Sequence, residues 1–81
     1  MRVFKAILSA GNRTNTWIII IRKNYRRCGW KIKGIRIYDG LETDAQDIPA
    51  TEIFTAIKIW AESRPGTFTI LTYGEIKLQG G

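Results

Sequence analysis

The sequence predicts a small α+β domain: a three-stranded antiparallel meander, then one helix packed on the sheet, then one further strand (β-β-β-α-β). Three observations carry this prediction. Residues 3–38 contain three apolar segments separated by short stretches of turn-forming residues, residues 53–60 place apolar side chains at helical spacing, and residues 67–73 are rich in β-branched and aromatic side chains. A chain of 81 residues without repeats or a linker-like tract is expected to form a single domain over residues 1–81.

The first two strands are expected at Val3–Ala10 and Trp17–Arg22, on either side of a turn at residues 11–15. In the first strand, alternating apolar residues mark one buried face. The second strand is apolar on both faces, which predicts a central position that is covered on both sides. A basic loop is expected at residues 23–29.

The third strand, at residues 30–38, shows a break in its alternation. The tryptophan and the isoleucine at its start share one face, whereas Ile35 and Ile37 fall on the opposite one. A β-bulge at Lys33-Gly34 would bring all four apolar side chains to the core, and glycine adopts bulge geometry at little cost. We therefore predict a bulge at this position.

The helix is expected to begin between Asp47 and Thr51, after an acidic connection at residues 39–49, with either residue as its N-cap. Arg64-Pro65-Gly66 should end it. One apolar stripe, expected to pack on the sheet, consists of Ile53, Ala56, Ile57 and Trp60.

The later strand is expected at residues 67–73 and should end at Gly74, because glycine weakens a strand interior. Ile76 and Leu78 then alternate in the pattern of a short last strand. The large side chains expected in the core are Trp17, Trp30 and Trp60.

Charge is distributed very unevenly along the chain, whose net charge is +6. Residues 1–38 contain ten basic side chains and no acidic one, whereas residues 39–81 contain three basic and seven acidic side chains. Such asymmetry predicts an electrostatically polarised surface if the fold keeps the two halves apart.

The residue inventory argues against catalysis, a cofactor or a metal site. The chain has no histidine, and so it has no Ser-His or Cys-His pair and no imidazole to move protons. Cys28 is the only cysteine, which excludes an internal disulfide and a zinc site of cysteine and histidine ligands. The four acids from Asp39 to Asp47 do not match a calcium loop and are expected to be solvated. We expect a non-catalytic protein.

The composition also suggests where the protein works. A small domain without disulfides fits a reducing compartment, which predicts a cytoplasmic protein. The longest apolar run, from Trp17 to Ile21, is far shorter than the roughly 20 residues that a membrane-spanning helix needs. No membrane partner is expected.

The leading hypothesis is nucleic-acid binding of low sequence specificity through the basic face of the N-terminal sheet, with DNA and RNA both open. Spaced cations neutralise phosphates, and an exposed aromatic ring stacks on a base. With the bulge, the cations of the third strand should point away from the core. The expected contact residues are Arg22, Lys23, Tyr25, Arg26, Arg27, Lys31, Lys33 and Arg36.

Three other interpretations stay open. The basic face is an ordinary solvated face whose cations protect strand edges against aggregation. Alternatively, the chain is a protein inhibitor or adaptor of the phage or plasmid type, which binds an acidic surface of a host protein. A third possibility is a self-associating structural subunit that forms a homo-oligomer through the exposed edge of the first or last strand.

The order of the elements and two segments resemble the first half of the ribonuclease H-like fold. Thr51–Ile57 looks like the family's helix, in which a Glu-Leu pair precedes small and aliphatic residues. Thr67–Thr72 looks like the strand that follows that helix and leads into a Thr-Asp-Ser motif.

The resemblance implies a truncated relative without catalytic activity, kept as a binding scaffold. The family's aspartates would fall at Ser9 or Ala10 and at Tyr73, so that only Glu52 remains of its carboxylates. One carboxylate cannot hold the paired metal ions that such nucleases use.

Overall fold

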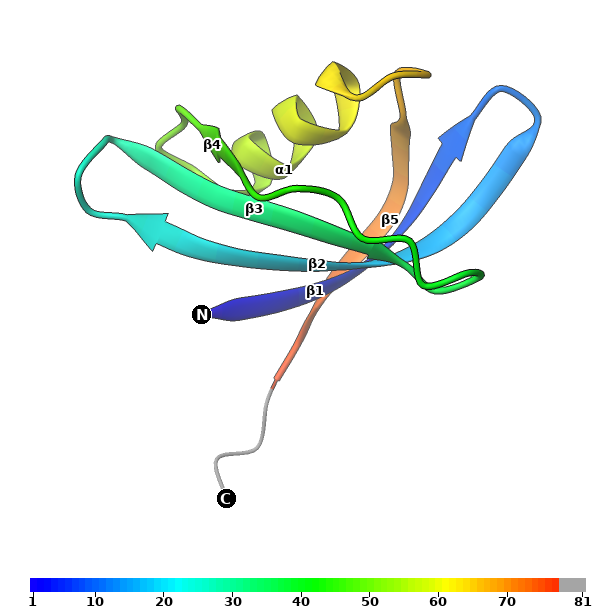
Figure 1. Cartoon of the computed structure of the whole chain (residues 1–81), viewed down its shortest axis with the longest axis horizontal. Coiled ribbons are helices and arrows are strands. Elements are labelled where there is room, and N and C mark those ends of the chain that lie inside the picture. Colours follow the sequence, from blue (N-terminus) through cyan, green and yellow to red (C-terminus); the bar gives the residue numbers. More distant parts are fainter. Residues whose placement is uncertain (78–81) are drawn as a thin grey trace.

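The computed structural model describes residues 1–77 and confirms the α+β class. One antiparallel sheet has the strand order β4-β3-β2-β1-β5, and one helix packs against it (Figure 1). The elements are β1 (Arg2–Ala10), β2 (Arg13–Asn24), β3 (Gly29–Arg36), β4 (Gln46–Ile48), α1 (Ile53–Ser63) and β5 (Thr69–Ile76). The predicted meander corresponds to β1, β2 and β3, and the predicted helix and later strand correspond to α1 and β5. Across residues 1–77, no helix has the length and apolar character needed to cross a bilayer.

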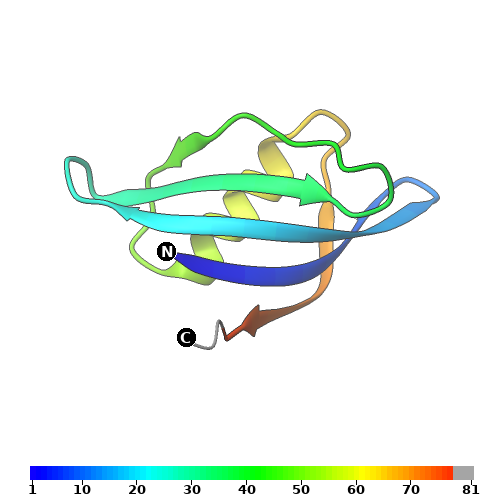
Figure 2. The ribbon, with the colours of Figure 1, turned by 60° about the horizontal axis from the view of Figure 1, so that its bottom comes forward.

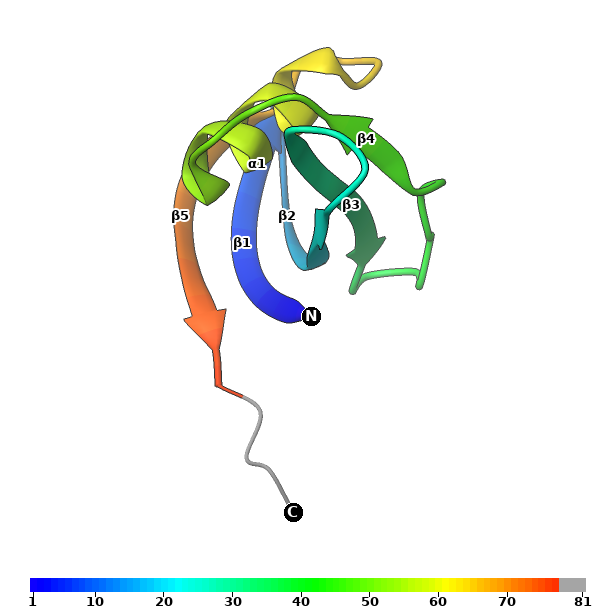
Figure 3. The same ribbon diagram turned by 90° about the vertical axis from the view of Figure 1, so that its left-hand side faces the viewer.

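The sheet curls around α1, so that the helix lies on its concave face (Figures 1 and 3). The convex face of β1, β2 and β3 is turned toward the viewer in Figure 2, and no element of the described chain covers it. Because α1 covers only one face, the two faces of the same strands meet different surroundings.

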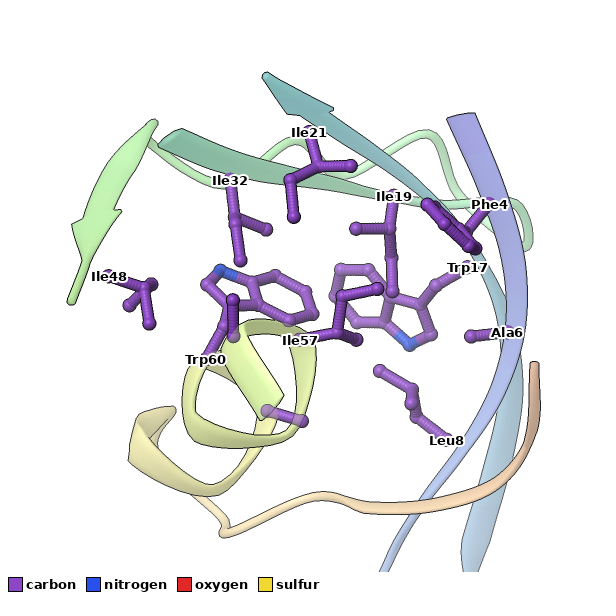
Figure 4. Close-up of a cluster of buried hydrophobic side chains, with 12 residues drawn as sticks. Phe4, Ala6, Leu8, Trp17, Ile19, Ile21, Ile32, Ile48, Ile57 and Trp60 are labelled. Carbon is purple, nitrogen blue, oxygen red and sulfur yellow. The ribbon is translucent and has the colours of Figure 1, made fainter. Parts of the chain in front are cut away.

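The core fills the space between the concave face and α1 (Figure 4). The two-residue period of the strands sends every second side chain inward, where it meets the apolar stripe of the helix. Trp17 and Trp60 meet edge to face, with ring centroids 6.1 Å apart, and Trp30 packs partly buried at the margin. The expected core role is therefore confirmed for Trp17 and Trp60, whereas Trp30 is only partly buried. The buried apolar residues are Phe4, Ala6, Leu8, Trp17, Ile19, Ile21, Ile32, Ile48, Ala56, Ile57, Trp60 and Ala61.

The predicted bulge in β3 is wrong, because β3 pairs with β2 in unbroken register along its whole length. Gly34 has a different role. A Cβ added there would lie 2.5 Å from Cη2 of Trp60, closer than real Cβ atoms come to other groups, and would make a tight contact of 3.1 Å with Cε3 of Trp17. The glycine is required because two indole rings occupy the space that any side chain would need.

The regular register decides which way the end of β3 points. Without a bulge, Ile35 and Ile37 lie on the convex face, where Ile37 is 53% exposed. Arg36 lies instead on the concave side, with its guanidinium carbon 5.8 Å from the centroid of the Trp17 ring. The prediction that both isoleucines join the core is wrong.

β2 takes the central position that its sequence predicted. The expectation that it is covered on both faces is wrong. Ile19 and Ile21 are fully buried beneath α1, whereas Ile18 and Ile20 are only half-buried on the convex face. An apolar strand of this kind therefore leaves aliphatic side chains at the surface.

The acidic connection contains a short strand, β4, that the sequence did not predict. Its Asp47 accepts a hydrogen bond of 2.8 Å from Nδ2 of Asn24, and Thr51 lies outside the helix. The helix starts at Ile53, with Glu52 as an N-cap that makes no side-chain hydrogen bond, so both expected caps are wrong. The helix ends at Ser63, directly before the predicted stop.

β5 continues through Gly74 to Ile76, so the expectation that the glycine ends the strand is wrong. The ladder with β1 persists because Gly74 is paired with Lys5. An irregularity in this ladder leaves Leu71 as an extra residue. The expected separate last strand is thus in part the end of β5, and its Leu78 lies outside the described residues.

Candidate functional site

The end of the β2–β3 ribbon projects beyond the rest of the sheet (Figures 1 and 2). The pairing of β1 with β2 stops at Arg2 and Ile21, so the last three residues of β2 pair only with β3. Asn24 shapes the turn, because its backbone oxygen accepts a 3.3 Å hydrogen bond from the amide of Arg27. Its side-chain Oδ1 accepts another, of 3.2 Å, from the amide of Arg26. This projecting segment, residues 22–31, is called the basic hairpin below.

The basic hairpin brings together most of the predicted contact residues. All of these except Arg27 line an open depression of about 610 Å³, in which Tyr25 is 93% exposed. Arg27 lies outside this depression and lines a neighbouring groove with Cys28 and Trp30. The residues around the depression are Met1, Arg22, Lys23, Asn24, Tyr25, Arg26 and Lys31.

The cations of the basic hairpin have no carboxylate partner in residues 1–77. No Asp or Glu oxygen in that range lies within 4.0 Å of the charged nitrogens of its three arginines or two lysines. Arg22 and Lys31 are directly opposite each other across the β2–β3 ladder, on the convex face. Like charges in such a pair repel, which destabilises the ribbon. Arg22 and Lys31 are therefore a cross-strand pair whose repulsion is offset by no carboxylate within 4.0 Å in residues 1–77.

The cations surround the hairpin; they do not share one face. Lys23 points to the concave side, where its Nζ lies 4.9 Å from the centroid of the Trp30 ring. A cation in this position is attracted by the ring quadrupole, which fixes the side chain. Asp47 is the cross-strand neighbour of Lys31 in β4, but its carboxylate accepts a hydrogen bond from Asn24.

Lys33 and Arg36, which the sequence grouped with these residues, are in a different environment. Nζ of Lys33 lies 2.7 Å from Oε1 of Glu42. Arg36 forms a two-pronged ion pair with Asp39, in which Nε donates to Oδ1 at 2.9 Å. The prediction that Arg36 shares the outer face with Lys31 and Lys33 is wrong, because the absent bulge leaves Arg36 on the concave side.

The Arg36–Asp39 pair changes both titrations. The side-chain hydrogen bond from Arg36 and the backbone hydrogen bond from Leu41 lower the pKa of Asp39 from 3.8 to about 2. The same hydrogen bond raises the pKa of Arg36. Both groups stay charged at neutral pH, and the pair leaves little positive field for an external anion.

Sequence reasoning missed Lys5 as a member of the convex face. It is exposed there, and its cross-strand partner in β2 is Ile18. The alternation of β1 already placed Lys5 opposite the buried Phe4, so the signal was present in the sequence. Lys5 becomes a candidate contact residue only because the structure shows that the convex face is uncovered.

The acidic side chains do not form a metal site. In the part of the chain that the structure describes, no three histidine, cysteine, aspartate or glutamate side chains converge on one point. The segment from Asp39 to Asp47 runs back beside β3 and brings its acids to particular cations of that strand.

No protein-family model, curated protein or solved structure matches this chain in comparisons with known proteins. The ribonuclease H-like resemblance therefore stays a prediction. Glu52, the only position in this sequence that matches a carboxylate of that family, is exposed at the start of α1. A function for the chain has to be argued from its own residues.

Proposed function

We propose that this protein is non-catalytic and binds nucleic acid with low sequence specificity through the basic hairpin. Arg22, Lys23, Arg26, Arg27 and Lys31 would neutralise phosphates, and Tyr25 would stack on an unpaired base. The observation that carries the proposal is the Arg22–Lys31 pair, in which two cations face each other with no carboxylate within 4.0 Å in residues 1–77. A phosphate placed between them turns a repulsion into two attractions.

The surroundings of this pair favour a polymer with regularly spaced charges. The cations lie around a projecting ribbon, so one backbone can follow several of them in succession. Tyr25 is almost fully exposed, which is unusual for a large aromatic side chain and suits stacking on a single strand. Neither feature reads a base edge, and this agrees with low specificity.

Salt dependence tests the proposal directly. The binding of fluorescein-labelled single-stranded RNA and DNA of mixed sequence is measured by fluorescence anisotropy between about 50 and 200 mM salt. Five phosphate contacts predict a log–log slope of about −3.5 for a single strand. A slope near zero, or no binding at the lowest salt, would overturn the proposal.

The stacking role of Tyr25 is tested by a matched pair of variants. Tyr25 and Tyr38 are 93% and 86% exposed, and only Tyr25 lies in the basic hairpin. Tyr25→Ala is expected to weaken single-strand binding roughly tenfold, because stacking on one base contributes about 1–3 kcal/mol. Tyr38→Ala should leave binding unchanged, and equal effects would refute a local stacking platform.

A second candidate function is supported by the convex face. This uncovered surface carries half-buried aliphatic side chains with Lys5 and Lys31 among them, which suits docking on an acidic and partly apolar protein surface. The aliphatic members are Val3, Ile7, Ile18, Ile20 and Ile35. This arrangement keeps the inhibitor or adaptor hypothesis as the alternative proposal.

Affinity capture from a nuclease-treated lysate separates the two candidates. An adaptor retains its protein partner after nuclease treatment and loses it when Ile20→Asp places a carboxylate on the convex face. A nucleic-acid-binding protein loses its captured material on nuclease treatment, whatever residue stands at position 20.

A further inference from the structure

β5 has an open edge. One side of the strand pairs with β1, and the other side has no partner among the strands of residues 1–77 (Figure 3). Seven of its eight residues are exposed, and the remaining one, Ile70, is half-buried. An unpaired edge presents a row of backbone donors and acceptors that can pair with another strand.

The two edges of the sheet differ in how they are protected. At the opposite edge, β4 has three residues and carries Asp47, so it is short and charged. β5 is eight residues long and contains no proline, lysine or arginine. Its one charge, Glu75, lies 2.7 Å from Nη2 of Arg2 and is neutralised by it. The usual devices that prevent edge-to-edge pairing are therefore absent from β5 between Thr72 and Ile76.

A rim of apolar side chains accompanies the open edge. The rings of Phe54 and Tyr73 are stacked with centroids 4.8 Å apart, yet they are still 40% and 43% exposed. Leu71, the extra residue of the β1–β5 ladder, is 54% exposed. α1 therefore covers β5 incompletely, and the edge offers side-chain contacts as well as hydrogen bonds.

We propose that β5 pairs antiparallel with β5 of a second copy of this chain. A two-fold axis perpendicular to the sheet, close to Tyr73, produces this arrangement and joins the two sheets into one. Both helices then lie on the same side, and Phe54 and Tyr73 of the two copies form one aromatic cluster across the axis. Such an interface is isologous, as in most soluble homodimers.

Charge favours contact between two copies at this edge over contact at the basic hairpin. Each copy carries +6, so two copies repel wherever their cations meet. Near β5 the Arg2–Glu75 pair is neutral, and Lys58 and Glu62 on α1 are of opposite sign. Lys5, which pairs with Gly74, and Lys77, which follows Ile76, add two positive charges beside β5. The basic hairpin carries five cations and is separated from β5 by β1. The proposal is independent of nucleic-acid binding.

The mass of the full-length chain in solution tests the proposal first. It is measured by sedimentation equilibrium at high salt, after nuclease treatment, over a wide range of protein concentration. We expect a reversible transition to twice the monomer mass of 9.3 kDa. A single monomeric species at every concentration overturns the proposal, and it does so without bearing on the nucleic-acid measurement.

A matched pair of lysine variants locates the interface. Leu71 and Ile37 are 54% and 53% exposed, and only Leu71 belongs to the open edge. Leu71→Lys is expected to raise the dimer dissociation constant at least about tenfold, because a charge on the edge opposes pairing. Ile37→Lys should leave it unchanged. Dimers that survive Leu71→Lys, or that are lost equally in both variants, overturn the assignment to β5.

Circular dichroism shows whether Leu71→Lys folds. If it does not fold, chemical cross-linking tests the same β5–β5 contact. In a Cys28→Ser background, Thr72→Cys places a thiol near the proposed axis, and a short bismaleimide should join the two copies. Thr14→Cys in β2, also exposed, provides the control and should stay monomeric on denaturing gels. Cross-links from position 14 alone would place the contact elsewhere and refute the pairing.

Discussion

The two ends of the β2–β3 ribbon carry similar cations in opposite electrostatic situations. At the hairpin end, Arg22 and Lys31 face each other without a carboxylate within 4.0 Å in residues 1–77. At the other end, Lys33 and Arg36 are each paired with an acid from the connection that follows β3. Each pair of cations consists of one arginine and one lysine.

The difference shows that a run of cationic residues in the sequence does not by itself produce a positively charged surface. The chain turns at residues 37–39, directly after β3, and returns beside that strand, so Asp39 and Glu42 reach the end of β3 that is nearest to them in sequence. The hairpin end lies beyond the reach of those two acids, and Asp47, which does come near it, is bonded to Asn24. The proximity of the acidic segment therefore divides the cations of the β2–β3 ribbon into those with a carboxylate partner and those without one in residues 1–77.

The largest expected effect compares the two ends directly. Arg22→Ala/Lys31→Ala should weaken nucleic-acid binding by more than about tenfold at low salt and make the salt slope shallower by about 1.4, because two phosphate contacts are lost. Lys33→Ala/Arg36→Ala removes the same types of charge and should change the affinity less than about threefold. Anisotropy titrations measure both.

Thermal unfolding of the same two variants should show the opposite trend. Loss of the repelling Arg22–Lys31 pair is expected to leave stability unchanged or slightly higher. Loss of the Lys33 and Arg36 ion pairs should lower stability slightly, because salt bridges between exposed groups contribute little. If the hairpin variant is instead the less stable one, the two ends do not differ as described.

Gly34 lies between Lys33 and Arg36, and its substitution tests the regular register that places those two side chains on opposite faces of β3. Gly34→Ala should lower the free energy of unfolding by roughly 1–3 kcal/mol, because the new methyl group overlaps the Trp60 ring. Chemical denaturation measures this. Gly74→Ala is the control, since no atom lies within 4 Å of its added Cβ.

Coupling to Trp60 identifies the cause of the Gly34 effect. Trp60→Phe removes the ring atoms that the methyl group would strike, so Gly34→Ala should cost less in that background. The same cost in both backgrounds would show that Gly34 is required for another reason.

A smaller increase in nucleic-acid affinity is expected when Lys33 loses its carboxylate partner. Glu42→Gln removes the carboxylate beside Lys33 and should strengthen nucleic-acid binding by a few-fold, with a slope about 0.7 steeper. Glu62→Gln changes the net charge equally, but it lies on α1 away from the ribbon. Equal gains from the two variants would mean that net charge alone governs binding.

The smallest effect concerns the titration of Asp39. Its folded pKa of about 2 lies below the ordinary value of 3.8, so the stability that the carboxylate contributes is fully present above pH 3.8. That contribution is lost as the pH falls from 3.8 to about 2. Carbon-detected NMR of the carboxyl group should give a midpoint near 2 in the native protein and a value closer to 3.8 in Arg36→Ala. An unchanged midpoint in the variant would contradict the assigned cause.

Much of the fold could be predicted from local patterns. The alternation of β1, the helical spacing from Ile53 to Trp60 and the stop at Pro65 each depend on neighbours in sequence, and each is confirmed. The errors arose where a distant contact decided the outcome. Gly34 suggests a bulge until Trp60 is seen to occupy its space, and Gly74 suggests a strand end until the ladder with β1 is seen to continue.

The candidate site divides in the same way. The sequence identified the cations of the basic hairpin and Tyr25, because a short turn keeps residues 22–31 together in any hairpin. It could not show that Lys33 and Arg36 are neutralised, since that depends on how the later segment returns beside β3. The sequence left an exposed edge open between the first and the last strand, because only the strand order reveals that β1 has two neighbours and β5 has one.

The sequence by itself determined the types of the elements it predicted, the buried faces of β1 and α1 and the excess of positive charge in the first 38 residues, since these follow from residue spacing and composition. Only the tertiary structure decided which cations have a carboxylate partner and which strand of the sheet has one neighbour. The physical reason is that electrostatic compensation and hydrogen-bond pairing act between groups brought close in space, and here those groups come from segments far apart in the chain.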